Sequence, residues 1–162
     1  MHPDVEQIML SEEEINNRVR ELGEQISRDY QGKSILVVGI LKGAMIFLAD
    51  LVRNISVPTY FDFMAVSSYG SSTETSGVVR IIKDLDFEIE NKHVLIVEDI
   101  VDSGITLRYL KKYLVAKNPS SVEIACLLNK PDRRQAEISV KYLGFDVPNY
   151  FLVGYGLDYA ER

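Results

Sequence analysis

The chain has 162 residues, 46% of them hydrophobic and 26% charged, and its formal net charge is −6 at pH 7. This length is that of one domain large enough to bury a core without disulfides or metals. Acidic residues (24) outnumber basic ones (18), which argues against broad binding to nucleic acid, because such binding requires a basic face.

The N-terminal residues and the overall hydropathy bear on where the protein works. Residues 1–6 lack the basic and apolar regions of a signal peptide, and no apolar stretch is long enough to cross a bilayer. We therefore expect a cytoplasmic protein with no membrane partner. His2 and His93 stand far apart with no partner ligand at metal-binding spacing, so we expect no zinc site.

The first patterned segment predicts an amphipathic helix. Ser11 and Glu14 have the spacing of a capping box, in which each side chain bonds the other residue's backbone N–H. Apolar residues then recur at helical spacing, at Ile15, Val19, Leu22 and Ile26. The helix is predicted to run to about Tyr30, where Gln31-Gly32-Lys33 ends it.

Strands and helices are predicted to alternate through the next part of the sequence. Short β-branched runs predict strands, and longer, mostly apolar stretches predict helices. We expect a strand over 35–40, a turn over 41–43, a helix over 44–55, a strand over 59–66, a loop over 67–77 and a strand over 78–82. The loop is rich in Gly and Ser and long for a compact domain, and such loops tend to be mobile and functional.

One segment near the middle of the sequence carries most of the chemical information. Val94 to Val97 predicts a strand buried on both faces, and two carboxylates, Glu98 and Asp99, follow it. Asp102 then opens the small-residue turn Ser103-Gly104-Ile105-Thr106, which leads into a predicted helix. A helix N-terminus offers free N–H groups to a phosphate, and the carboxylates can hold a vicinal diol or a hard cation. This combination suits a sugar phosphate.

The same residues also have a simpler interpretation. Strand–turn–helix units are common, and Asp102 would then only cap the helix while Glu98 and Asp99 are solvated. From the residues alone, both interpretations stay open.

The second half of the sequence continues the alternation. Leu107, Leu110 and Leu114 predict a helix that Asn118-Pro119 closes, and further strands are expected over 122–128, 140–145 and 150–153. Cys126, inside the first of these strands, is the one cysteine. It excludes an internal disulfide, fits a reducing compartment, and is expected to be buried and inert.

This alternation predicts an α/β fold with a parallel-sheet core and helices on both faces. Because no repeat or linker divides the sequence, we expect a single domain over residues 1–162. The last stretch departs from the alternation. With the N-terminal residues it is expected to form a small hood lobe, built from roughly residues 130–162, above the C-terminal edge of the sheet.

Residues 94–106 resemble the phosphoribosyl-pyrophosphate (PRPP) motif of the type I phosphoribosyltransferases. That motif has four apolar, two acidic and two apolar residues, then Asp, Ser or Thr, Gly, any residue and Thr, and every position is filled here. The resemblance implies the type I fold, with Glu98 and Asp99 binding the ribose hydroxyls and Mg²⁺. It implies that Asp102 is the catalytic acid–base residue and also contacts PRPP. The residues implied to hold the 5′-phosphate are Ser103, Gly104, Ile105 and Thr106.

Two segments in the first half resemble the 6-oxopurine (hypoxanthine/guanine) branch of this family. Leu41-Lys42-Gly43 resembles its pyrophosphate loop, which often contains a non-proline cis peptide before the lysine. Lys42 and Gly43 are therefore expected to bind pyrophosphate. Ser67-Ser68-Tyr69-Gly70 resembles the start of its flexible catalytic loop, so Ser68 and Tyr69 are expected to close over the reacting centre.

Two segments near the C-terminus resemble the base-binding part of the same branch. Lys130 ends a predicted strand where that branch reads the base, and it is expected to donate to O6 of the purine. Phe151 is expected to stack on the purine and Leu152 to line its site. Asp158 is expected to bind at the purine site and to hold a second Mg²⁺ directly or through water. The ordinary alternatives are a solvated lysine, a core phenylalanine and a surface acid.

The resemblance implies a Mg²⁺-dependent purine-salvage transferase, a homodimer or homotetramer, that makes IMP or GMP and pyrophosphate from PRPP and hypoxanthine or guanine. A xanthine-preferring transferase is one alternative, because xanthine also carries O6. A PRPP-sensing regulator that binds RNA is another, although the net charge of −6 argues against it. Family members usually continue with a strand and a Tyr-Arg segment that helps to hold pyrophosphate, and this sequence ends at Arg162.

Overall fold

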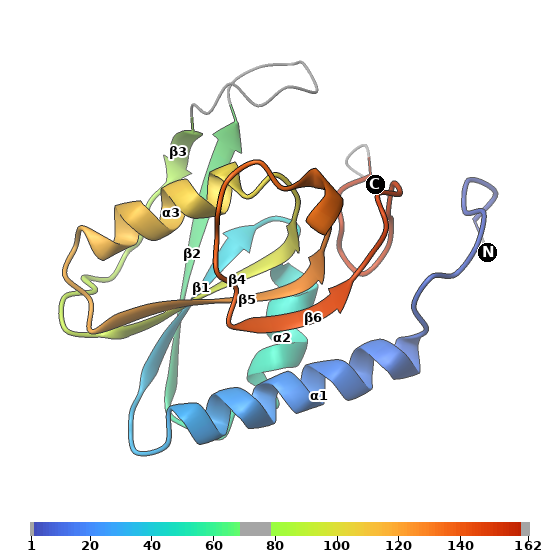
Figure 1. Ribbon diagram of the computed structural model, residues 1–162. Helices are drawn as coiled ribbons and strands as arrows, with labels where there is room; N and C mark the ends of the chain where they lie inside the picture. The colour runs from blue at the N-terminus through green and yellow to red at the C-terminus, as the bar shows by residue number, and fades with distance from the viewer. Residues whose placement is uncertain (1, 69–78, 160–162) are drawn as a thin grey trace.

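The computed structural model describes residues 2–68 and 79–159, and Figure 1 shows one twisted sheet with helices on its two faces. In chain order the elements are α1 (Glu12–Asp29), β1 (Ile35–Leu41), α2 (Met45–Val52), β2 (Thr59–Ser68), β3 (Val79–Lys83), β4 (His93–Val101), α3 (Ile105–Val115), β5 (Ser121–Asn129), the 3-10 helix η1 (Pro131–Arg133) and β6 (Tyr142–Asp146). The predicted α/β fold is confirmed. None of the described helices is both long enough and apolar enough to span a bilayer.

The sheet has the strand order β3-β2-β1-β4-β5-β6. The neighbours from β2 to β6 all pair in parallel, as the alternation of strands and helices predicts. The edge strand β3 instead pairs with β2 in antiparallel fashion. Its direction differs from the prediction because residues 69–78 alone connect the two strands, fewer than the dozen or so that a parallel crossover needs.

The strand order reverses between β1 and β4. After β1 the chain passes through α2 to β2 on one side, and after β4 it passes through α3 to β5 on the other. The connections therefore diverge at the carboxyl ends of β1 and β4. Open α/β sheets bind ligands in the crevice at such a reversal, so the strand order already points to these two ends.

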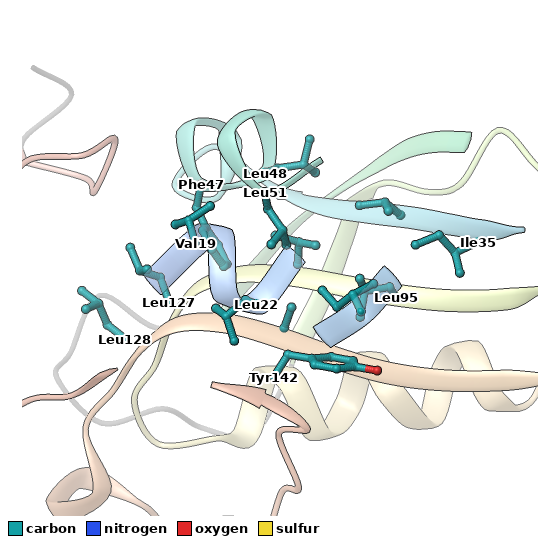
Figure 2. Close-up of a cluster of buried hydrophobic side chains, with 14 of the residues drawn as sticks. Val19, Leu22, Ile35, Phe47, Leu48, Leu51, Leu95, Leu127, Leu128 and Tyr142 are labelled. Atoms are coloured by element: carbon teal, nitrogen blue, oxygen red, sulfur yellow. The ribbon is translucent and has the colours of Figure 1, made fainter. Parts of the chain in front are cut away.

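Apolar clusters cover both faces of the sheet. Figure 2 shows the cluster beneath α1 and α2, which includes Leu22 and Phe47. The cluster on the opposite face is packed under α3 and contains the predicted helical leucines. In β1, Val37 joins the first cluster and Val38 the second, so that strand is buried on both faces, as its apolar run predicts. Cys126 lies in the second cluster as a free, buried thiol, as predicted.

The start of α1 confirms the capping box. Ser11 Oγ accepts a hydrogen bond from the Glu14 backbone N–H at 3.1 Å, and the Glu14 carboxylate accepts one from the Ser11 N–H at 2.7 Å. The helix ends at Asp29, one residue before the predicted end. Across the sheet edge, Arg18 donates from Nε to the Gly144 carbonyl at 3.0 Å, which ties α1 to β6.

Two predicted elements differ from the structure. The second helix was expected over 44–55 but covers Met45–Val52, and turn hydrogen bonds from Asn54 and Ile55 follow it. Residues 150–153 are irregular rather than a strand. Their apolar side chains face a cavity and the core instead of a strand partner, and positive φ angles at Gly154 and Gly156 turn the chain back on itself.

The predicted loop over 67–77 lies mostly outside the described residues. Ser67 and Ser68 end β2, and Tyr69 is not described. The expected hood lobe remains a prediction. One contact supports it: the Tyr159 hydroxyl donates to the Asp4 carboxylate at 2.7 Å, which links the two ends of the described chain.

Candidate functional site

The two adjacent carboxylates lie inside β4 rather than after it. The strand continues to Val101, and Glu98 pairs in register with Cys126 of β5. Each carboxylate accepts a hydrogen bond from the next backbone N–H, Glu98 from Asp99 at 3.0 Å and Asp99 from Ile100 at 2.7 Å. Both acids therefore have fixed positions at the C-terminal end of the sheet.

The acidic pair is electrostatically unfavourable as it stands. Burial raises the pKa of Glu98 well above its ordinary value, and the neighbouring Asp99 carboxylate adds to the shift. Burial also raises the pKa of the Cys126 thiol, with further contributions from both carboxylates. The raised pKa of Cys126 agrees with an inert thiol. A cation or a set of hydroxyl donors beside Glu98 and Asp99 would relieve the repulsion between them.

The turn after β4 encloses a small cavity at the start of α3. Gly104, with φ of 82°, is the N-cap residue, and no side chain caps the helix from that position. A cavity of about 160 Å³ is lined by Glu98, Asp99, Asp102, Ser103, Gly104 and Thr106, among others. Ile105 does not line it, and its N–H donates to Ser103 Oγ at 3.3 Å. The turn predicted to hold the 5′-phosphate thus encloses a space beside Glu98 and Asp99.

Asp102 does not cap α3, so that simpler interpretation is wrong. The cap position belongs to Gly104. The Asp102 carboxylate instead accepts a hydrogen bond through Oδ1 from Arg133 Nε of η1, at 3.0 Å. Asp102 also lines the small cavity, which places its carboxylate beside the space that a ligand would fill.

The turn after β1 meets the acidic pair directly. The Leu41–Lys42 peptide bond is cis, as the resemblance implies. A Cβ atom built on Gly43 would lie 2.0 Å from Asp99 Oδ2, so only glycine allows this approach of backbone to carboxylate. The ends of β1 and β4, distant in sequence, therefore form one site at the reversal of strand order.

Lys130 is buried, unlike a typical lysine at the end of a strand. Its relative exposure is 9%, and its backbone N–H donates to the Val101 carbonyl at 2.9 Å, which fixes it beside the end of β4. Among residues 2–68 and 79–159, the structure gives Nζ no hydrogen-bond or ion-pair partner. Nζ is not among the buried side-chain atoms that lack a hydrogen-bond partner, so the stem is buried while the ammonium group stays open to water or to an acceptor on a bound ligand.

The C-terminal tail forms one wall of a second, larger cavity of about 1280 Å³. Phe151 lines it and is 76% exposed, which rules out the interpretation of Phe151 as a core residue. Its ring lies 6.1 Å from that of Tyr159, tilted by 58°. Leu152 also lines the cavity and packs against the cluster beneath α1 and α2. Asp99 lines both cavities, so the exposed face of Phe151 and the acidic pair border a common region.

Asp158 is not gathered with the other two predicted metal ligands. Within the described residues, no group of three or more Asp, Glu, His or Cys side chains could hold a metal ion. The tail is anchored elsewhere, since the Tyr155 hydroxyl donates to Asp50 of α2. That carboxylate and burial together raise the pKa of Tyr155, with burial the larger cause.

Two contacts around the site, made by Arg133 and Gly156, were not predicted from the sequence. Arg133 contacts Asp102, but a basic residue shortly after a proline carries no recognisable signal of that role. Gly156, at φ of 84°, passes close to Ile46 at the start of α2. Its place in a Gly-Tyr-Gly sequence could have indicated a tight turn against another segment.

Comparison with known proteins agrees with this geometry. The model of the phosphoribosyl transferase domain family matches residues 9–160. The hypoxanthine-guanine phosphoribosyltransferase of Mycobacterium tuberculosis is 54% identical over 165 residues, which cover 98% of this chain and 82% of that protein. A crystal structure of a Staphylococcus aureus hypoxanthine phosphoribosyltransferase superposes with a TM-score of 0.96 at 50% identity, covering 100% of this chain and 88% of that one.

A more distant relative has the same fold. A Trypanosoma cruzi hypoxanthine phosphoribosyl transferase, solved in work on how its C-terminal region affects oligomeric state and activity, has a TM-score of 0.92 at 39% identity. The alignment covers 98% of this chain and 87% of that one. The family model matches nearly the whole sequence and the fold is shared with solved members, so the chain belongs to the phosphoribosyltransferase family.

Proposed function

We propose that the protein transfers the phosphoribosyl group of PRPP to hypoxanthine or guanine, producing IMP or GMP and pyrophosphate in purine salvage. One observation carries this proposal: the Gly43 backbone approaches Asp99 so closely that the expected pyrophosphate loop and the acidic pair form a single site. The relatives named hypoxanthine-guanine phosphoribosyltransferase support the choice of base. No feature of the described residues favours the xanthine-preferring enzyme or the RNA-binding regulator.

The proposed reaction divides among groups at this site. Ser103, Gly104 and Thr106 would hold the 5′-phosphate, with the N–H groups at the start of α3 directed to its oxygens. Lys42 and Gly43 would hold the pyrophosphate. As the bond from C1 of the ribose to pyrophosphate breaks, N9 of the purine forms its bond to C1 from the opposite face. The proton on N7 of the purine then passes to the Asp102 carboxylate.

The base would be fixed by two groups beside this centre. Lys130 would donate to O6, and the exposed ring of Phe151 would stack on the purine face, with Leu152 at its edge. We further propose that Ser68 and Tyr69 close over the reacting centre. Closure would exclude water from the ribose while its C1 carries positive, oxocarbenium-like charge in the transition state.

The residues present fit a magnesium requirement. Mg²⁺ in phosphate sites usually takes one or two carboxylates and completes its shell with water and substrate phosphates, so a cluster of three protein acids is not needed. Glu98 and Asp99 would hold it, since a cation beside them would offset the burial and the repulsion by Asp99 that raise the pKa of Glu98. Asp158 would contact a second ion directly or through water. When bound, Mg²⁺ neutralises charge on the leaving pyrophosphate.

A panel of bases tests the proposed function. Purified protein would be supplied with PRPP, Mg²⁺ and, in turn, hypoxanthine, guanine, xanthine, adenine or uracil, and nucleotide formation followed by chromatography. We expect IMP and GMP, and no AMP or UMP. XMP as the main product would favour the xanthine-preferring alternative. No product from any base, together with salt-sensitive binding of RNA, would favour the regulator.

Lys130→Met tests how the base is recognised. We expect KM for hypoxanthine to rise and PRPP affinity to stay near that of the parent, because the lost hydrogen bond from a charged donor to O6 costs about 2–3 kcal/mol. Steady-state kinetics with each substrate varied in turn gives both values. Lys141→Met, at an exposed lysine near Asp29 of α1, is the matched control and should change neither. If PRPP affinity collapses instead, Lys130 belongs to the phosphate site.

We also propose a homodimer or homotetramer that works in the cytoplasm. Met45 and Ile46 leave apolar surface exposed at the start of α2, and exposed apolar patches often mark contacts between subunits. Light scattering at several concentrations would give the oligomeric state.

The single buried thiol, with no disulfide partner in the sequence, suits a reducing compartment such as the proposed cytoplasm.

A further inference from the structure

The Asp102 carboxylate uses its two oxygens differently. Oδ1 accepts the hydrogen bond from Arg133 Nε at 3.0 Å. Oδ2 has no hydrogen-bond or ion-pair partner within residues 2–68 and 79–159. One oxygen is therefore held by the protein, while the other remains available to a molecule in the cavity that Asp102 lines.

Arg133 belongs to a segment that is hydrogen-bonded at one end to the last residue of β4 and at the other end to the turn after it. The Lys130 N–H donates to the Val101 carbonyl at 2.9 Å. At the other end, the N–H groups of Gln135 and Ala136 both donate to the Ser103 carbonyl, at 2.9 and 3.0 Å. These backbone hydrogen bonds flank Arg133, so its guanidinium is presented to Asp102 from a fixed backbone.

The ion pair contributes little to the stability of the fold. The two side chains are 44% and 45% exposed, and pairs that solvent reaches to this extent are weak because water screens them. Its geometry is nevertheless directional, because the planar guanidinium donates along fixed N–H directions. An arginine in this place can fix the rotation of a short carboxylate even where it adds almost no stability.

We propose that Arg133 is a positioning residue: it holds Oδ1 of Asp102 so that Oδ2 faces N7 of the bound purine. This inference rests on the proposed function. O6 and N7 lie side by side on the same edge of a 6-oxopurine. Lys130 would donate to O6, and Arg133 would orient the Asp102 carboxylate that faces N7. These two residues are the ends of the segment Lys130-Pro131-Asp132-Arg133. One short, doubly fastened segment thus sets the spacing of both contacts to the base.

The test is a double-mutant cycle on the rate of phosphoribosyl transfer. Single-turnover rates with hypoxanthine and saturating PRPP would be measured for the parent, Arg133→Ala, Arg133→Lys, Asp102→Asn and Arg133→Ala/Asp102→Asn. We expect Arg133→Ala to slow transfer about tenfold with PRPP affinity unchanged, because misorientation of a reacting group is costly. Arg133→Lys, which keeps the charge and one donor, should restore part of the rate. In the Asp102→Asn background, Arg133→Ala should change the rate less than twofold.

Arg20→Ala provides the matched control. Arg20 is an exposed arginine bonded to Asn17 in α1, and its loss should leave the rate unchanged. Equal rates for Arg133→Ala and the parent would overturn the inference, and so would a tenfold effect that persists in the Asp102→Asn background. A parent that makes no IMP would contradict the proposed function itself. A parent that is active and impaired by Asp102→Asn but not by Arg133→Ala would contradict this inference alone.

Discussion

Asp102→Asn is expected to lower kcat by ~10²–10⁴ while PRPP binding changes little. Asparagine keeps the size of the side chain and one acceptor oxygen, which can still accept the hydrogen bond from Arg133, while its NH2 group replaces the oxygen that would face N7. It cannot take up a proton as a carboxylate does. If Asp102 removes the proton from N7, the substitution therefore affects the chemical step and leaves the binding of PRPP nearly intact.

The measurement is single-turnover formation of IMP, with PRPP affinity determined separately by equilibrium titration. Asp86→Asn is the control, because Asp86 is an exposed carboxylate paired with Lys83 on the surface, and its loss should not alter kcat. The fold should survive Asp102→Asn, since Gly104 rather than Asp102 occupies the cap of α3. Equal rates for Asp102→Asn and the parent, with chemistry limiting in both, would end the case for Asp102 as the acid–base residue.

Gly43→Ala is expected to reduce kcat/KM for PRPP by about 10²-fold or more, because an error of about 1 Å in positioning can cost that much. The added Cβ would lie 2.0 Å from Asp99 Oδ2, far inside van der Waals contact. Asp99 cannot simply rotate away at no cost, since its other oxygen accepts the Ile100 N–H at 2.7 Å. Either the turn after β1 or the carboxylate must move, and both belong to the proposed site.

Steady-state kinetics with PRPP varied, together with thermal unfolding, would separate loss of function from loss of fold. Gly32→Ala is the matched control. Gly32 has φ of 78° but nothing within 4 Å of an added Cβ, so alanine there introduces backbone strain without a clash. We expect Gly32→Ala to lower stability slightly and to leave kcat/KM unchanged. Normal activity of Gly43→Ala would mean that the close approach to Asp99 has no part in catalysis.

Local pattern by itself determined most of the secondary structure. The capping box at Ser11 and the apolar stripe behind it involve residues within a few turns of one another, so their energetics are present in the sequence. The apolar runs that became β1, β4 and β5 were predicted for the same reason. The parallel core followed, because buried strands that alternate with helices have few other ways to cover both faces.

The reactive groups of the candidate site were also evident in the sequence. Carboxylates, a small-residue turn and a helix start fall within one short segment, so their order along the chain already determines that they are neighbours. The roles assigned to Asp102 and its neighbours remain proposals. The structure supports them by enclosing a cavity with these residues.

Only the tertiary structure decided which distant residues meet this segment. Gly43 reaches Asp99 because β1 and β4 pair in parallel and their carboxyl ends coincide at the reversal of strand order. Arg133 reaches Asp102 because backbone hydrogen bonds to Val101 and Ser103 fold its segment back onto the turn. Such contacts depend on strand register and on packing summed over the whole core, so no local pattern contains them. The direction of β3 follows from the short connection between β2 and β3. The irregular tail after β6 follows from its packing, which the periodicity of apolar residues does not predict.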